Sequence, residues 1–287
     1  MNNTENNRKN YCINEKHVEL NIRCEIDAND GLIEALDPME KAKTINPKYN
    51  FDNFVVGNSN KYAHAIATAA SETHGEVYNP IFIYGGSGLG KTHLMHAIEI
   101  QLLKNNPKLN VLYVSAETFT NELITAMQTR KIVEFKNKYR EADVLLVDDI
   151  QFLEGKECTQ EEFFYTFNTL FANSKQIIIS SDRALNKLIN FDRKLTSRMG
   201  SNIVIDIQPP DYETRVAILE KKAENLEVEI DDDIYQVICM IASNNAIKDN
   251  IRDLEAAFNR VVKISKVLGD KITVSYAKNV LSDIGEL

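Results

Sequence analysis

Eight consecutive residues carry the strongest chemical signal in the sequence, and they combine glycines with a lysine and a threonine. Glycines let successive backbone N–H groups curl around phosphate oxygens, a geometry that Cβ atoms would obstruct. The lysine can reach the β- and γ-phosphates of a nucleotide as a point charge, and the threonine can offer its hydroxyl to Mg²⁺. The stretch therefore predicts a nucleoside triphosphate site. Its residues are Gly85, Gly86, Ser87, Gly88, Leu89, Gly90, Lys91 and Thr92.

The residues on either side of this loop predict the strand and the helix that a phosphate-binding loop requires. The short apolar run 81–84 is typical of a buried strand, and Leu94, Ala97 and Ile98 follow the loop at helical spacing. The amino end of that helix would direct its positive dipole at the same phosphates. A chance Gly-Lys-Thr in a glycine-rich turn would not have this context, so we favour the nucleotide site.

A pair of carboxylates ends another apolar run, at positions 144–147. Asp148 and Asp149 would lie at the carboxyl edge of a buried parallel strand, where ligands of open α/β sheets bind. We expect Asp148 to hold Mg²⁺, through water, and Asp149 to orient or polarise the attacking water. The competing interpretation is a solvated acidic turn. The phosphate-binding loop earlier in the chain favours the catalytic interpretation.

The run QIIISSDR at 176–183 predicts a third strand that ends in polar residues. Asp182 would then lie beside the γ-phosphate and report whether that phosphate is present. The alternative is that Ser181 and Asp182 cap the amino end of a following helix.

Composition and charge restrict the class of protein. The 287 residues carry a net charge of −9, which argues against a protein that coats duplex DNA through a broad basic face but leaves local contact with a strand open. The sequence shows no apolar run long enough to span a membrane and no signal peptide, so we expect a cytoplasmic protein. The four cysteines are scattered without a CxxC pair and are expected to be reduced thiols; they are Cys12, Cys24, Cys158 and Cys239.

The order of apolar patterns predicts an α/β fold with three segments. Residues 1–45 form a polar tail or a small docking segment, residues 46–210 an α/β nucleotide-binding domain and residues 211–287 a helical lid domain. Strand patterns alternate with helices in the second segment, as in a parallel sheet covered on both faces. The further strands are expected at 110–115, 143–148, 176–181 and 202–207. In the third segment helices are expected at 212–225, 231–243, 249–267 and 274–284, with N-caps at Asp211, Asp231, Asp249 and Thr273.

Taken together, motifs along residues 46–285 resemble the P-loop AAA+ core of the bacterial DnaA family, the chromosomal replication initiators. The match is in order and at the same spacing, and it implies a P-loop AAA+ parallel sheet flanked by helices and followed by a small all-α lid. It runs through NPKYNFDNFVVGNSNKYAHA, GGSGLGKTHLMHAI, LLVDDIQFL, EEFFYTFN, QIIISSDR, LTSRMG, PPDYETRVAIL and NIRDLEAAFNRV.

The resemblance assigns further roles in ATP or ADP binding. Val55 and Val56 would lie against the adenine. Asp182 would be the first sensor, and Arg252 would be the second sensor, on the lid and facing the subunit's own nucleotide. Arg198 would be an arginine finger that reaches the ATP of a neighbouring subunit, which would make ATP an assembly switch.

The resemblance also implies contacts with single-stranded DNA, through an additional helical pair at 116–142. Ile124 and Lys156 match strand-contacting positions, whereas Cys158 occupies a position where the family commonly has arginine. A local basic cluster on the second helix could contact backbone phosphates, although charged stripes are usually just solvated. Its members are Arg130, Lys131, Lys136, Lys138 and Arg140.

Two functions remain open. The first is an initiator module that binds Mg·ATP, assembles as a homo-oligomer, engages single-stranded DNA and supports origin opening or loading of the replicative helicase. The second is a regulator comparable to Hda, which forms a hetero-oligomer with full-length DnaA and controls its ATP state. The sequence stops at Leu287, after the lid, so we do not expect the sequence-specific duplex recognition of the family's helix-turn-helix domain. We expect slow hydrolysis, because Asp149 stands where many fast AAA+ motors have glutamate.

Overall fold

The computed structural model describes residues 46–73, 75, 77–244 and 250–282. All of them belong to one compact unit, which spans Thr44–Leu287. The tail or docking segment predicted for residues 1–45 lies outside the described residues, so that expectation stays a prediction.

Five parallel strands form the sheet, in the spatial order β2-β3-β4-β1-β5. Each is short and mostly apolar, as expected for strands that are covered on both faces. The α/β prediction and all five predicted strand positions are confirmed. The strands are β1 (Ile81–Gly85), β2 (Val111–Ser115), β3 (Val144–Asp148), β4 (Gln176–Ser181) and β5 (Ile203–Ile207).

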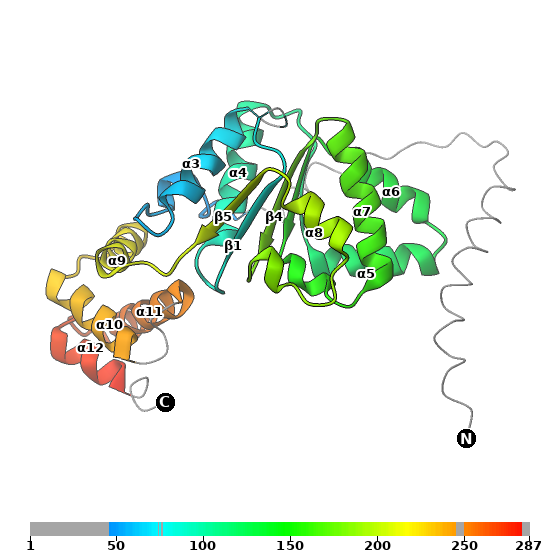
Figure 1. Cartoon of the computed structure of the whole chain (residues 1–287). Coiled ribbons are helices and arrows are strands. Elements are labelled where there is room, and N and C mark those ends of the chain that lie inside the picture. The colour runs from blue at the N-terminus through cyan, green and yellow to red at the C-terminus, as the bar shows by residue number, and fades with distance from the viewer. Residues whose placement is uncertain (1–45, 74, 76, 245–249, 283–287) are drawn as a thin grey trace, which may run out of the picture. The chain divides into compact units, whose positions relative to one another are not determined.

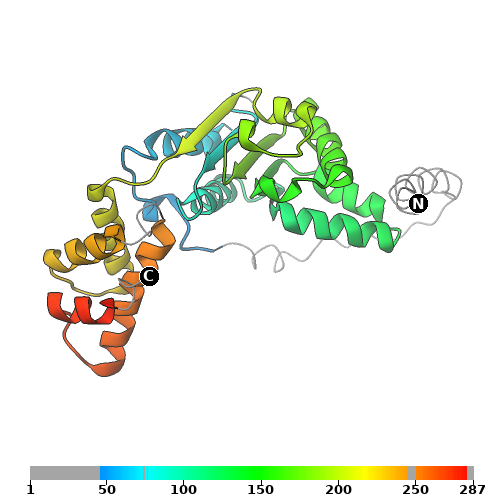
Figure 2. The same cartoon turned by 60° about the horizontal axis from the view of Figure 1, so that its bottom comes forward.

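Two layers of helices cover the sheet (Figures 1 and 2). Along β1, Ile81 and Ile83 belong to one hydrophobic cluster with helices α3 and α4, while Phe82 belongs to the opposite cluster with α5, α6, α7 and α8. This alternation follows from the period of two of a strand. The helices are α3 (Lys61–Glu72), α4 (Lys91–Asn105), α5 (Ala116–Gln128), α6 (Ile132–Arg140), α7 (Glu157–Ala172) and α8 (Arg193–Met199).

Three single-turn 3-10 helices connect these elements. They are η1 (Phe51–Asn53), η2 (Ile150–Leu153) and η3 (Leu185–Lys187). The segment after β4 continues into η3, whose N-cap residue is Ala184. The alternative in which Ser181 and Asp182 cap a helix is therefore wrong, and both residues end the strand as the catalytic interpretation expects.

The residues after β5 form helices that share a hydrophobic core of their own, built around Leu219, Ile238 and Phe258. Asp211 and Thr273 are N-caps as expected, each accepting a hydrogen bond from a backbone N–H three residues on. The expectation for Asp249 is wrong: it lies outside the described residues, and Asn250 caps α11 through its side chain. The boundary at residue 210 stays a prediction. The helices are α9 (Tyr212–Leu226), α10 (Asp232–Asn244), α11 (Ile251–Leu268) and α12 (Val274–Val280).

Within the described part of the chain, every helix is too short or too polar to cross a membrane.

Candidate nucleotide-binding site

A cavity of about 370 Å³ lies at the carboxyl edge of the sheet. The loop after β1, the first turn of α4, the segments after β3 and β4 and the first turn of α11 all contribute to its wall. Strand order explains this convergence, because β4 lies between β1 and β3 and brings three strand ends together. The lining residues are Tyr49, Ser87, Gly88, Gly90, Lys91, Thr92, His93, Asp149, Gln151, Phe152, Asp182, Ile251, Arg252 and Glu255.

Two glycines of the loop are required by its backbone geometry. Gly90, the N-cap of α4, has φ +98°, and Gly88 has φ +74°, both in the left-handed region that favours glycine. A Cβ on Gly88 would also collide with the side chain of Asn250. The backbone N–H of Ile251 donates to the carbonyl oxygen of Gly88 at 3.2 Å. The phosphate-binding loop is therefore in direct contact with the start of α11.

Lys91 is 6% exposed, and its ammonium group lies over the loop backbone. Its Nζ donates to the carbonyl oxygens of Gly85 and Gly86 at 2.8 and 2.9 Å. Burial lowers the pKa of Lys91, and the negative charges of Asp149, Asp148 and Asp182 partly offset this effect. The ammonium group is thus held where the loop curls, beside three carboxylates.

Asp148 is almost fully buried at the end of β3, and three hydroxyl groups donate to its carboxylate. Thr92 and Tyr113 donate to Oδ2 at 2.7 and 2.8 Å, and Ser180 donates to Oδ1. Burial and the charge of Asp148 raise the pKa of Tyr113, so its hydroxyl stays a donor at neutral pH. The predicted Mg²⁺ residues Thr92 and Asp148 are therefore direct neighbours.

These two residues fit Mg²⁺ as a shared ligand of protein and nucleotide. Magnesium is usually held by one or two protein oxygens together with substrate phosphates and water. Among the described residues, no group of three His, Cys, Asp or Glu side chains gathers into a metal site made by protein alone. The oxygen pair Thr92–Asp148 beside a phosphate-binding loop is the arrangement that a nucleotide-bound magnesium ion requires.

Asp149 has the left-handed backbone conformation, with φ +56°, which turns the chain sharply away from the strand. Its backbone N–H donates to the hydroxyl of Ser180 at 2.9 Å, and its carboxylate accepts from Gln151 at 3.0 Å. Asp149 lines the cavity, whereas Asp148 lies behind Thr92. The two acidic residues thus face different surroundings, as their different predicted roles require.

Asp182 also lines the cavity, and its carboxylate is paired with the next residue. The guanidinium of Arg183 donates to both oxygens of Asp182, at 2.7 and 2.9 Å, and lies 3.6 Å from Glu154. The hydrogen bond with Asp182 raises the pKa of Arg183. A bare carboxylate would repel a γ-phosphate, and the paired guanidinium reduces that repulsion.

Several predicted residues lie outside the cavity lining. Gly85 ends β1, Gly86 follows it, and Leu89 packs in the core. Val55 lies just before the turn that leads into α3, with its carbonyl accepting from Asn60, and Val56 is 49% exposed. The adenine assignment of these two valines therefore stays a prediction.

Arg198 and Arg252 occupy different positions relative to the cavity. Arg252, in the first turn of α11, lines it. Arg198 is exposed in the last turn of α8 and is absent from the lining. This separation is consistent with roles on the subunit's own nucleotide for Arg252 and on another subunit for Arg198.

The predicted strand-contacting residues are exposed, but the neighbouring basic cluster is largely paired. Ile124 is 46% exposed on α5, and Lys156 is the exposed residue before α7. Carboxylates from α5, α6 and α7 lie within 4 Å of four of the five basic residues. The ion pairs are Lys131–Glu134, Lys136–Glu162, Lys138–Glu122 and Arg140–Glu162. Local positive charge is therefore smaller than the sequence suggests.

Sequence reasoning missed the residues that hold the acidic groups in place. Tyr113, Ser180, Gln151 and Arg183 all bond to Asp148, Asp149 or Asp182, and Tyr49 stacks on His93 at the cavity wall. One signal was available: Tyr113 and Ser180 are polar residues near the carboxyl ends of apolar strands.

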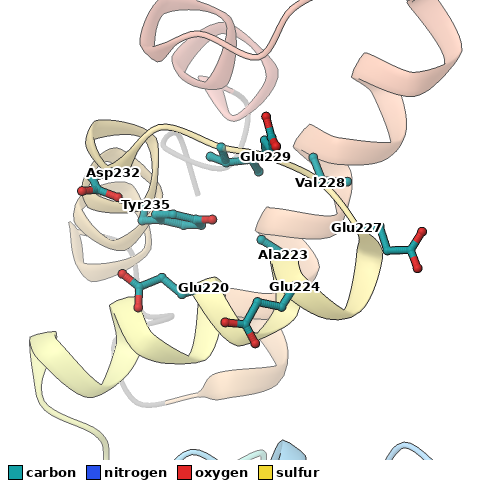
Figure 3. Close-up of a pocket in the computed structure, with 9 residues that line it drawn as sticks. Glu220, Ala223, Glu224, Glu227, Val228, Glu229, Asp232 and Tyr235 are labelled. Atoms are coloured by element: carbon teal, nitrogen blue, oxygen red, sulfur yellow. The ribbon is translucent and has the colours of Figure 1, made fainter.

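A second cavity, of about 640 Å³, lies between α9 and α10 and does not fit a nucleotide (Figure 3). Tyr235 forms part of its floor, while carboxylates surround it. A polyphosphate would be repelled there, since every charged residue of the wall is acidic. Those residues are Glu220, Glu224, Glu227, Glu229 and Asp232.

Comparison with known proteins agrees with the geometry. The family described as the bacterial DnaA ATPase domain matches residues 45–206. Domain III of the Thermotoga maritima replication initiation protein DnaA is 39% identical, with a TM-score of 0.79 over 85% of this chain and 99% of that one. AMPPCP-bound DnaA from Aquifex aeolicus is 38% identical, with a TM-score of 0.69 over 79% of this chain and 67% of that one.

A further DnaA structure, bound to AMPPCP and single-stranded DNA, is 38% identical, with a TM-score of 0.70 over 79% of this chain and 67% of that one. The Thermotoga maritima branch-migration protein RuvB, at 21% identity and a TM-score of 0.59, shares the fold. The predicted AAA+ fold is thereby confirmed, and the chain belongs to the bacterial DnaA ATPase domain family.

Proposed function

We propose that this chain is an initiator-type ATPase module that binds Mg·ATP, assembles through Arg198 and engages single-stranded DNA to support origin opening. One observation carries the proposal. The hydroxyl of Thr92 lies 2.7 Å from the carboxylate of Asp148, directly beside the buried ammonium group of Lys91. Those three groups match the three needs of a triphosphate with its metal: a hydroxyl ligand, a carboxylate and a cation.

Nucleotide binding would follow from the loop and the residues around it. Backbone N–H groups of residues 85–91 would receive the phosphates, and Lys91 would move its hydrogen bonds from the loop carbonyls to the β- and γ-phosphates. Bound magnesium would neutralise charge between those phosphates. Asp149, which lines the cavity, would orient the attacking water, and its short side chain favours slow hydrolysis. The AMPPCP-bound relatives support this assignment.

Assembly would depend on ATP because Arg198 cannot serve the cavity of its own subunit. An exposed guanidinium that meets a γ-phosphate of a second subunit gains a charge-assisted contact, and ADP would not provide it. Arg252, within the cavity lining, would sense the γ-phosphate from the lid side of the same subunit. ATP would then act as the switch between free subunits and an assembly.

Contact with single-stranded DNA is supported by a relative whose structure contains it. Ile124 and Lys156 are both exposed and available to a strand. The paired basic cluster limits the electrostatic part of such binding.

The Hda-like regulator remains the second candidate, and one observation favours it. Four of the five basic residues on and before α6 are already paired with carboxylates, and exposed Cys158 supplies no positive charge where arginine is common. A regulator would still bind ATP, but it would join full-length DnaA and would not bind the strand itself.

Equilibrium binding of ATP to the Lys91→Ala variant tests the common element of both candidates. We expect affinity to fall by at least ~100-fold, because the variant lacks the only cation of the phosphate-binding loop. Lys104→Ala, at the other end of α4, serves as the control and should bind like the wild type. Undiminished affinity in Lys91→Ala would show that the loop is not the nucleotide site.

A further inference from the structure

The side chain of Gln151 joins the two acidic segments of the cavity. It lies in η2, two residues after Asp149, and lines the cavity. Its Nε2 donates to Oδ1 of Asp149 at 3.0 Å, and its Oε1 accepts from the backbone N–H of Asp182 at 3.1 Å. One amide group therefore connects the end of β3 to the end of β4.

Both bonds act on groups that can otherwise move. Asp149 follows the strand in the left-handed conformation, so no ladder hydrogen bond fixes its carboxylate. The bond from Gln151 occupies Oδ1 and leaves Oδ2 facing its other neighbours. The bond to Asp182 holds the first backbone N–H beyond β4, where the sensor carboxylate begins.

An amide is the side chain suited to this place. It carries a donor and an acceptor on one rigid plane, whereas a carboxylate only accepts and a hydrocarbon does neither. A carboxylate at position 151 would face Asp149 with like charge and lose the donated bond. A leucine would keep the approximate size and lose both bonds.

We propose that Gln151 is a positioning residue for ATP hydrolysis: it fixes the Asp149 carboxylate that orients water and ties its orientation to the segment that carries Asp182. This inference rests on the proposed function, in which Asp149 orients the water. A change of the Asp182 segment on γ-phosphate binding would then be transmitted to Asp149 through a single side chain.

The test uses the variants Gln151→Leu and Gln151→Glu of the full chain. A matched control is Gln208→Glu, because Gln208 likewise donates to an aspartate two residues before it, Asp206, and does not line the cavity. Three quantities are measured for each protein: the thermal midpoint of unfolding, the dissociation constant of Mg·ATP, and the single-turnover rate of hydrolysis of bound ATP.

We expect both Gln151 variants to hydrolyse bound ATP at least ~10-fold more slowly, with ATP affinity within about 3-fold of the wild type, as for loss of water orientation alone. Between about pH 8 and about pH 5.5 the rate ratio of Gln151→Glu to Gln151→Leu should rise, because the introduced carboxyl becomes a donor when it is protonated. A purely structural role would not produce that rise. Gln208→Glu should match the wild type.

Two results would overturn the inference alone: a wild-type rate in Gln151→Leu, or a loss of rate that only follows a loss of ATP affinity or stability. A pH-independent ratio of the two variants would also contradict it. A wild-type chain that binds ATP and never hydrolyses it would overturn this inference together with the proposed role of Asp149, while leaving the nucleotide site intact. Failure of the wild type to bind ATP would overturn the proposed function itself.

Discussion

Tyr113 on β2 and Thr92 on α4 donate hydrogen bonds to the same oxygen of Asp148, at 2.8 and 2.7 Å. Tyr113 approaches that oxygen from the neighbouring strand, in register one position away, since Ser115 pairs with Asp148. His96 packs against the Tyr113 ring at 4.2 Å and limits its movement. The buried phenol therefore holds the carboxylate in one orientation at the predicted magnesium position.

Replacement of Tyr113 by phenylalanine should weaken the response to magnesium. The variant lacks one hydrogen bond to a charged acceptor, so we expect the Mg²⁺ concentration for half-maximal stabilisation of bound ATP to rise by roughly 3- to 10-fold. Titration of Mg²⁺ against ATP affinity measures this. Tyr139→Phe is the matched control, because Tyr139 donates at the same distance of 2.8 Å to Glu122, away from the cavity. Equal shifts in both variants, or none in Tyr113→Phe, would contradict the role of Tyr113.

Binding of single-stranded DNA should depend only weakly on salt. Each phosphate neutralised on a single strand contributes a slope of about −0.7 in log K against log [salt], so five free cations would give about −3.5. Because four of the five cluster residues are paired, we expect a slope of about −1 to −2. Fluorescence anisotropy of a labelled oligonucleotide across a salt series measures it.

A companion variant separates pairing from distance. Glu122→Gln releases Lys138 from its ion pair and should make the slope steeper by about 0.7 if the strand passes along α6. A wild-type slope near −3.5 would show that the ion pairs open on binding. An unchanged slope in Glu122→Gln would place the strand away from Lys138.

Stability should fall in mildly acidic solution, in part through His64. Its ring lies between Phe51 and Phe54, with ring centroids 5.4 and 5.8 Å away, and burial lowers the pKa of His64. The unfolded chain therefore binds the proton more readily than the folded chain. The stability contribution is complete above the unfolded pKa of about 6.5 and is lost as pH falls toward the lower folded value.

The His64→Leu variant tests this sign. We expect its free energy of unfolding to decline less steeply than that of the wild type between about pH 7 and about pH 5. A residual decline should remain, because burial also lowers the pKa of His93. Denaturant unfolding at a series of pH values provides the comparison, and parallel curves for the two proteins would rule out a contribution from His64.

The sequence was informative where chemistry follows directly from local order. Asp148 could be placed at a strand end because four apolar residues precede it, and Lys91 could be placed in a phosphate-binding loop because a strand and a helix flank it. Both predictions need only neighbouring residues. The same holds for the five strands, whose apolar runs are short and continuous.

The residues that sequence reasoning missed depend on contacts between distant segments. Gln151 meets Asp182, and Ser180 meets Asp148, only because β4 inserts beside β3 in the order β2-β3-β4-β1-β5. The basic cluster was overestimated for the same reason. Lys138 pairs with Glu122 across 16 positions and Arg140 with Glu162 across 22, and helical periodicity within α6 does not indicate either pair.

Sedimentation velocity of the pure protein with Mg·ATP or Mg·ADP, each with and without a single-stranded oligonucleotide, tests the central claim most directly. The comparison includes Arg198→Ala and, as a matched control, Arg193→Ala, an exposed arginine in the first turn of the same helix. We predict large complexes for the wild type and Arg193→Ala with ATP and the strand, and none with ADP or with Arg198→Ala. A wild-type protein that binds ATP, stays a single subunit and ignores the strand would contradict the initiator function and support the regulator.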